Sequence, residues 1–111
     1  MFSFEKNAIK RATEKLKEVL GDNLIAVAAF GSRVRGDFSQ GSDFDILVVV
    51  RKRTFDIIDI INNVFGDEED RTDIPFSVVV KGTDSFEKEK IYNTTFYRNI
   101  KREGIVLHGR T

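Results

Sequence analysis

The sequence predicts a small α/β domain in which helices flank a mixed β-sheet. Two continuous apolar runs, Leu24 to Phe30 and Phe44 to Val50, are short and bounded by glycine or polar residues, as buried strands are. Apolar residues at helical spacing come before, between and after these runs. The chain has 111 residues and no cysteine, which predicts one domain over 1–111 without disulfides or thiolate metal sites.

The first half of the chain gives two helices around the two apolar strands. The first helix is predicted from Glu5 to Leu20, with Gly21 as its C-terminal cap. The second is expected to begin after Thr54 as N-cap and to end near Phe65, where Gly66 would terminate it. The acidic run 67–70 is then interpreted as a solvated turn.

The second half supplies the remaining elements. A third strand is expected over roughly 74–80, and Pro75 near its start favours an edge position. A helical stretch can begin at Asp84, a last helix is expected over 95–103, and a short strand over 105–107. The predicted order is therefore α-β-β-α-β-α-β, and the edge of so small a sheet leaves a homo-oligomer open.

The composition narrows the classes of function. The 18 Lys and Arg residues balance 18 Asp and Glu residues, so no overall basic field indicates binding to nucleic acid. No apolar stretch is long enough to span a bilayer, and the charged N-terminus lacks the core of a signal peptide. These observations predict a soluble protein of the cytoplasm.

A spaced motif indicates a metal site. Gly31-Ser32 is followed, ten residues later, by Asp43-Phe44-Asp45 at the start of the second apolar run. Residues two apart on a strand face the same side, about 6–7 Å from each other, so Asp43 and Asp45 would project together. Paired carboxylates repel unless a cation joins them, and oxygen ligands suit Mg²⁺ or Mn²⁺. Serine and aspartate at a strand start are also typical of turns, which is the competing interpretation.

The other half of the motif suits a phosphate. Gly31 would let a phosphate approach the backbone, and Ser32 would donate hydrogen bonds. Arg33 and Arg35 are candidates to clamp phosphate oxygens. Ser42, directly before the first aspartate, is included among the expected nucleotide-binding residues.

The stretch from Phe30 to Gly36, followed by that from Ser42 to Val48, resembles the minimal nucleotidyltransferases of the DNA polymerase β-like superfamily. The segment 92–105 is similar to the C-termini of that family. The resemblance implies the nucleotidyltransferase fold, ATP bound through Gly31 and Ser32, and Mg²⁺ held by Asp43 and Asp45. It also implies a small helical partner of the HEPN type, often a toxin, onto whose tyrosine the nucleotidyltransferase transfers AMP as antitoxin.

One position departs from that family pattern. The superfamily usually has a third carboxylate on the neighbouring strand, and the best placement of that position here is Ser77. Asp73 has the same strand parity as Ser77 but lies about 13 Å away along an extended chain. A bulge near Pro75 could shorten that gap. A serine is a poor general base without an activating neighbour.

The leading hypothesis is therefore transfer of AMP from ATP to a hydroxyl of a partner protein. The alternative is a catalytically degenerate antitoxin that binds nucleotide and neutralises its HEPN partner by contact. Transfer to a small molecule comes third, because a short chain has no second domain to bind the acceptor. Tyr92, Phe96 and Tyr97 would either pack helix against sheet or form an aromatic wall for a partner or an adenine.

Overall fold

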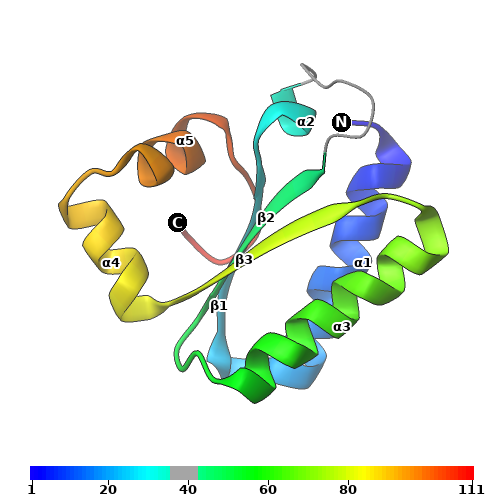
Figure 1. The fold of residues 1–111 in the computed structure, drawn as a ribbon, viewed down its shortest axis with the longest axis horizontal. Helices are drawn as coiled ribbons and strands as arrows, with labels where there is room; N and C mark the ends of the chain where they lie inside the picture. Colours follow the sequence, from blue (N-terminus) through cyan, green and yellow to red (C-terminus); the bar gives the residue numbers. More distant parts are fainter. Residues whose placement is uncertain (36–42) are drawn as a thin grey trace.

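The computed structural model describes residues 1–35 and 43–111, without the side chains of Ser32 and Arg35. The predicted helices and strands occur in the predicted sequence, with helices on both sides of one sheet (Figure 1). The order differs from the predicted one by a short helix between the first two strands and by two helices, rather than one, between the last two. The helices and strands are α1 (Ser3–Leu20), a 3₁₀ turn (Gly21–Asn23), β1 (Leu24–Phe30), α2 (Ser32–Arg35), β2 (Phe44–Val50), α3 (Phe55–Thr72), β3 (Phe76–Gly82), α4 (Thr83–Ile91), α5 (Thr95–Glu103) and β4 (Ile105–His108). The predicted fold class is confirmed.

The strands form a mixed sheet in the order β3-β2-β1-β4. β1 is antiparallel to both β2 and β4, whereas β2 and β3 are parallel. The two central strands are therefore the two continuous apolar runs of the sequence. Strands buried on both faces need no polar alternation, which is why both runs could be assigned from composition and length alone.

Helices cover the two faces of the sheet separately. α1 and α3 pack on one face against Phe44, Ile46 and Val48 of β2. α4 and α5 pack on the other face, where Phe86 and Ile100 meet Leu47 and Val49. The side chains of β2 thus alternate between two apolar cores, and the parity of a β2 residue decides which pair of helices it faces.

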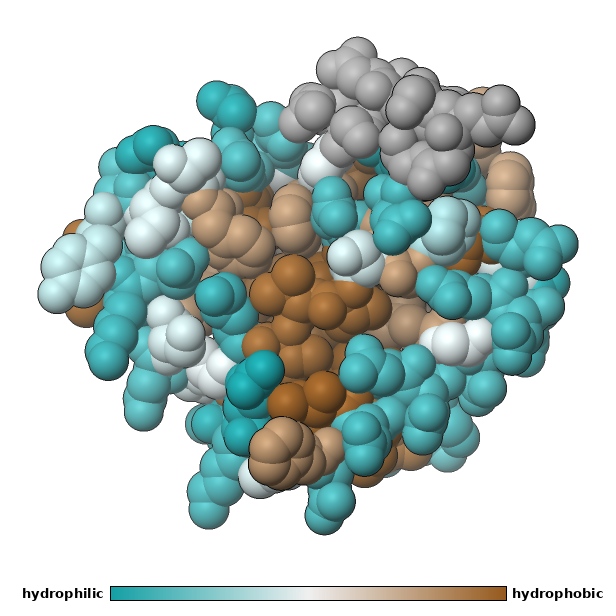
Figure 2. Space-filling model, in the orientation of Figure 1, coloured by the Kyte–Doolittle hydropathy of each residue, from teal (hydrophilic) through white to brown (hydrophobic). Residues whose placement is uncertain are grey.

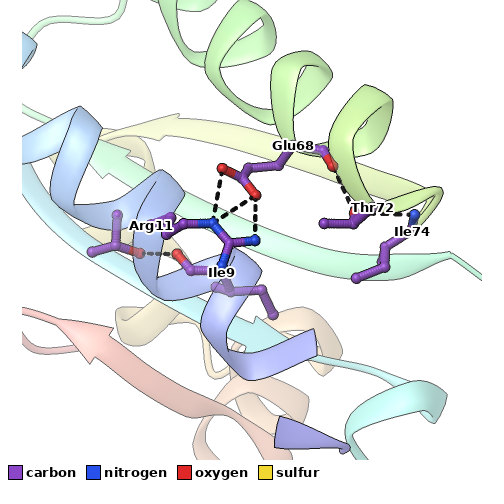
Figure 3. Close-up of polar contacts among 6 residues, drawn as sticks. Ile9, Arg11, Glu68, Thr72 and Ile74 are labelled. Atoms are coloured by element: carbon purple, nitrogen blue, oxygen red, sulfur yellow. Dashed lines mark hydrogen bonds and ion pairs between the residues drawn. The ribbon is translucent and has the colours of Figure 1, made fainter. Parts of the chain in front are cut away.

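α3 is longer than the sequence predicted. Thr54 caps it as expected, accepting a hydrogen bond from the amide of Ile57. Gly66 does not end the helix, however, and the acidic run 67–70 is helical rather than a turn. A tertiary contact explains the difference. Glu68 is buried, and its Oε1 accepts hydrogen bonds from Nη2 and Nε of Arg11 in α1, at 2.9 and 3.2 Å (Figure 3).

β3 begins two residues later than predicted but is an edge strand, as Pro75 indicated. Its outer backbone is met by side chains at two points: Glu69 Oε1 accepts from the amide of Phe76, at 2.6 Å, and Arg53 Nε donates to the carbonyl of Val80, at 2.9 Å. Figure 2 shows hydrophobic surface where β3 crosses the molecule in Figure 1, between the hydrophilic surfaces of the flanking helices.

Within the described residues, no helix has the length and apolar character needed to cross a membrane.

Candidate functional site

The two aspartates of the motif lie at the end of the sheet where β2 begins. Asp43 directly precedes β2 and is exposed, while Asp45 is the second residue of the strand and half-buried. Asp45 has the parity of Leu47 and Val49, so its side chain lies on the face covered by α4 and α5. Asp43 lies two residues earlier, just outside the strand, and is close enough for its charge to act on Asp45.

The environment of Asp45 makes its ionised form costly. Desolvation by burial raises the pKa of Asp45 above the ordinary 3.8, and the negative charge of Asp43 raises it further. A cation bound between the two carboxylates would relieve both effects. The electrostatics of the pair therefore fit a divalent ion with oxygen ligands.

Gly31 packs directly against Asp45. Its φ of +88° belongs to the left-handed region that side chains disfavour, and a Cβ at this position would overlap Asp45 Oδ2. The bare backbone of Gly31 thus lies against the carboxylate, and α2 starts at the next residue. The two halves of the motif, ten residues apart in sequence, meet here.

The remaining polar residues of the motif are only partly described. Ser32 and Arg35 are the first and last residues of α2, and their side chains lie outside what the structure describes. Ser42 belongs to the segment 36–42, which is also outside the described residues. Their predicted contacts with phosphate stay predictions.

Arg33 has a position that the sequence did not predict. Its Nη2 donates to Glu5 Oε2 of α1 at 2.7 Å, and its Cζ lies 4.6 Å from the centroid of the Phe44 ring. Phe44 belongs to the core that α1 and α3 share. The guanidinium therefore lies toward α1, on the face of β2 opposite to that of Asp45, and its predicted contact with phosphate stays a prediction.

The structure defines the surroundings of the third carboxylate position. Ser77 is exposed and pairs with Asp45 across the parallel strands β2 and β3. Asp73 is the C-cap of α3, before β3 begins, and the pairing of β2 with β3 runs without the bulge that could bring it closer. Among residues 1–35 and 43–111, no three acidic, histidine or cysteine side chains come together as a metal site.

Aromatic side chains line the face beside Asp45. Phe30 pairs with Asp45 across β1 and β2. The ring of Phe96 from α5 packs edge-on against the ring of Phe30, with 5.5 Å between the two centroids. Lys81 Nζ lies 5.1 Å from the centroid of the Phe96 ring. Tyr97 packs on Phe86, whereas Tyr92 is 77% exposed. Phe96 thus packs α5 against the sheet and Tyr97 packs α5 against α4, while Lys81 adds a cation that the sequence did not single out.

Glu5 was also missed, although the sequence carries a signal for it. Its spacing of four and seven residues from Ile9 and Ala12 puts it on the apolar face of α1. A carboxylate on such a face needs a partner, because burying an unpaired charge is costly. The partner, Arg33, is distant in sequence, so only the fold reveals it.

The residues present fit Mg²⁺ with a nucleotide. Asp43 and Asp45 supply the one or two carboxylates that Mg²⁺ usually takes from a protein, and the phosphates of a nucleotide supply further oxygen ligands.

The sequence profile of the nucleotidyltransferase domain matches residues 9–107, which include Gly31, Asp43 and Asp45. The chain belongs to the nucleotidyltransferase family. Membership agrees with the geometry at Gly31 and Asp45, because the two halves of the motif come together as one site.

Known relatives of this nucleotidyltransferase cover nearly its whole length. A Methanocaldococcus jannaschii protein named as a putative protein adenylyltransferase is 30% identical, over 94% of this chain and 98% of its own. The crystal structure of a putative nucleotidyltransferase from Sulfolobus solfataricus is similar with a TM-score of 0.56 and 25% identity, over 94% of this chain and 79% of that one.

A third similarity concerns the fold alone. A structure of a tri-AMPylated Shewanella oneidensis HEPN toxin in complex with an MNT antitoxin matches with a TM-score of 0.51 and 18% identity. The match covers 91% of this chain and 70% of the other.

Proposed function

We propose that this nucleotidyltransferase uses Mg²⁺ to transfer AMP from ATP to a hydroxyl group of a partner protein, a small helical protein of the HEPN type. The observation that carries the proposal is the contact of the Gly31 backbone with Asp45, beside Asp43. This contact puts a backbone that a phosphate can approach next to two carboxylates that can share a cation. A nucleoside triphosphate with its metal needs both.

Each residue has a defined part in this proposal. Asp43 and Asp45 hold Mg²⁺, which when bound neutralises charge on the phosphates as the transfer proceeds. Gly31 and the first residues of α2 bind phosphate oxygens through the backbone. The hydroxyl oxygen of the acceptor attacks the α-phosphorus, its proton passes to solvent water, and pyrophosphate leaves with the electrons of the broken bond.

The surroundings of Asp45 bear on the acceptor. Ser77 occupies the position next to Asp45 on β3, and the described residues bring no third carboxylate there to act as base. A tyrosine hydroxyl, whose ordinary pKa is about 10, needs less help from a base than an aliphatic hydroxyl does. A tyrosine acceptor on a protein therefore suits this site, and it agrees with the adenylyltransferase name of the M. jannaschii relative.

The absence of a third carboxylate among the described residues also favours a second candidate. A protein with this site could bind Mg²⁺ and ATP without turnover and neutralise a HEPN partner by contact. Labelling separates the two candidates, because only the enzyme forms a covalent bond between AMP and the partner.

The test is transfer of label from ATP to the purified partner protein in the presence of Mg²⁺. We expect label from the α-phosphate to appear on the partner, label from the γ-phosphate not to, and chelation of Mg²⁺ to abolish transfer. The variant Asp43→Asn/Asp45→Asn should lose transfer while remaining folded. Asp73→Asn is the matched control, since Asp73 is exposed at the end of α3 and asparagine also tolerates its left-handed conformation.

A wild-type protein that binds and silences the partner without labelling it would refute the enzyme and establish the antitoxin that acts by contact. Equal transfer by the Asp43→Asn/Asp45→Asn variant would refute the assignment of the site.

A further inference from the structure

Glu5 is a buried carboxylate that joins two segments of the chain. It lies in the first turn of α1 and is 4% exposed. Its Oε1 accepts a hydrogen bond from the amide of Phe2 at 2.8 Å, and its Oε2 accepts one from Arg33 Nη2 at 2.7 Å. The start of α1 and the helix α2 are therefore bound to the same carboxylate.

Arg33 extends this connection to β2. Its side chain is 15% exposed and its guanidinium lies over the ring of Phe44, the residue between the two aspartates. Asp45 and the guanidinium lie on opposite faces of the strand. Arg33 can therefore hold α2 against the end of β2 without occupying the face on which the metal and the phosphates would bind.

α2 needs such support because it has only four residues. A helix of one turn is not stable by itself, since few hydrogen bonds offset the cost of ordering its backbone. Its position depends on tertiary contacts, among them the packing of Val34 on the core and the pair of Arg33 with Glu5. Gly31, which must lie against Asp45, directly precedes this helix.

We propose that Glu5 is a positioning residue for the nucleotide site. Through Arg33 it fixes α2, and α2 fixes the backbone of Gly31 against Asp45. The consequence for nucleotide binding rests on the proposed function, whereas the consequence for the position of α2 does not. Glu5→Gln removes the negative charge that Arg33 Nη2 contacts at 2.7 Å, so Arg33 and α2 should shift.

The sequence suggested another role for Arg33, that of a phosphate clamp, and the two roles predict opposite effects of one substitution. If Arg33 is a clamp that Glu5 holds back, Glu5→Gln releases it toward the phosphates and tightens the binding of Mg²⁺-ATP. If Glu5 positions α2 through Arg33, the same substitution weakens binding. The direction of the change decides between the roles.

The experiment compares Glu5→Gln with the wild type in two measurements. The affinity for a non-hydrolysable Mg²⁺-ATP analogue should fall about tenfold, as for other residues that orient the groups of a metal site. The amide resonances of residues 31–35 should move in proton–nitrogen NMR spectra recorded without nucleotide.

Glu68→Gln is the matched control. Glu68 is buried to a similar extent, 6% exposed, and also pairs with an arginine, but its pair joins α1 to α3. This variant should lose stability while its affinity for the analogue and its resonances for residues 31–35 stay as in the wild type.

Three results would overturn the proposal: tighter binding by Glu5→Gln, unmoved resonances of residues 31–35, or equal effects of Glu68→Gln on these resonances. If the wild type binds no nucleotide, the proposed function fails, and the resonances still decide whether Glu5 positions α2. If Glu5→Gln does not fold, Arg33→Lys replaces it. This variant keeps the positive charge but loses the planar guanidinium that pairs with Glu5, so the positioning role predicts moved resonances of residues 31–35 in the absence of nucleotide, and unmoved resonances would overturn it.

Discussion

At the scale of single residues, Gly31 and Gly66 differ in whether their position tolerates a side chain. Gly31 has a positive φ, and a Cβ there would overlap Asp45. Gly66 is in the interior of α3, and a Cβ there would meet no atom within 4 Å. The same substitution should therefore have opposite effects at the two positions.

We predict that Gly31→Ala destabilises the protein by about 2 kcal/mol, because it combines a disfavoured φ with an overlap. It should also abolish binding of Mg²⁺-ATP by displacing Asp45 or the backbone. Gly66→Ala, the control, should raise the free energy of unfolding by about 0.5–1 kcal/mol, because alanine favours the helix. Urea unfolding of both variants measures this, and a Gly31→Ala variant with the stability and affinity of the wild type would contradict the described site.

Asp45 predicts a dependence of stability on pH. Burial and the charge of Asp43 raise the pKa of Asp45 in the folded chain above the ordinary 3.8. Between pH 3.8 and this raised pKa, the folded chain therefore binds more protons than the unfolded chain. Its contribution to stability is therefore lost as the pH rises through that interval.

In a buffer with a chelator, Asp45→Asn should be more stable than the wild type at neutral pH, and the difference should shrink as the pH falls toward 3.8. Mg²⁺ should restore stability to the wild type and not to this variant. Urea midpoints over a pH series measure both effects. A constant difference between the two proteins at every pH would show that the titration of Asp45 is not its cause.

At the scale of elements, the end of α3 depends on its contact with α1. The pair of Arg11 with Glu68 joins the two helices, and Thr72 Oγ1 donates to the carbonyl of Glu68 at 2.6 Å within α3 (Figure 3). The signals that predicted an earlier end of α3, a glycine and a run of acidic residues, are local features of the sequence. They contain no information about an arginine that lies 57 residues earlier in the chain.

Removing the partner of Glu68 should therefore be costly. Arg11→Ala leaves a buried carboxylate unpaired, and we expect a loss of about 2 kcal/mol in the free energy of unfolding. Lys17→Ala is the control, because its pair with Glu14 lies on the surface of α1 and should contribute less than about 0.5 kcal/mol. Thermal or urea unfolding of the two variants compares them, and equal losses would show that burial of Glu68 does not set the strength of its pair.

At the scale of the whole molecule, the sheet ends on one side at β3, whose outer backbone is met by Glu69 and Arg53. Exposed edges invite pairing with another chain, and charged side chains at an edge oppose it. We predict that Arg53→Ala/Glu69→Ala increases self-association. Sedimentation velocity at matched concentrations would measure it, with Lys52→Ala/Asp70→Ala as a control of equal charge change at exposed neighbouring positions. Unchanged sedimentation would mean that these two side chains do not protect the edge.

Much of the fold could be predicted because its signals are local. β1 and β2 have the predicted limits, since a buried strand is a continuous apolar run between polar residues. Thr54 and Gly21 act as the predicted helix caps. The position of Asp45 on the face opposite to Phe44 and Ile46 likewise needs only the two-residue repeat of a strand.

Contacts between distant segments could not be predicted in the same way. The length of α3 depends on Arg11, the position of Arg33 depends on Glu5, and the closeness of Gly31 to Asp45 depends on the antiparallel pairing of β1 with β2. Local patterns in the chain give the strands, the caps and the types of residue available to a metal site, because each of these reflects neighbours in sequence. Which charged groups pair, and on which face of β2 each one lies, is set by packing between segments far apart in the chain, because a buried charge takes whichever partner the fold brings to it.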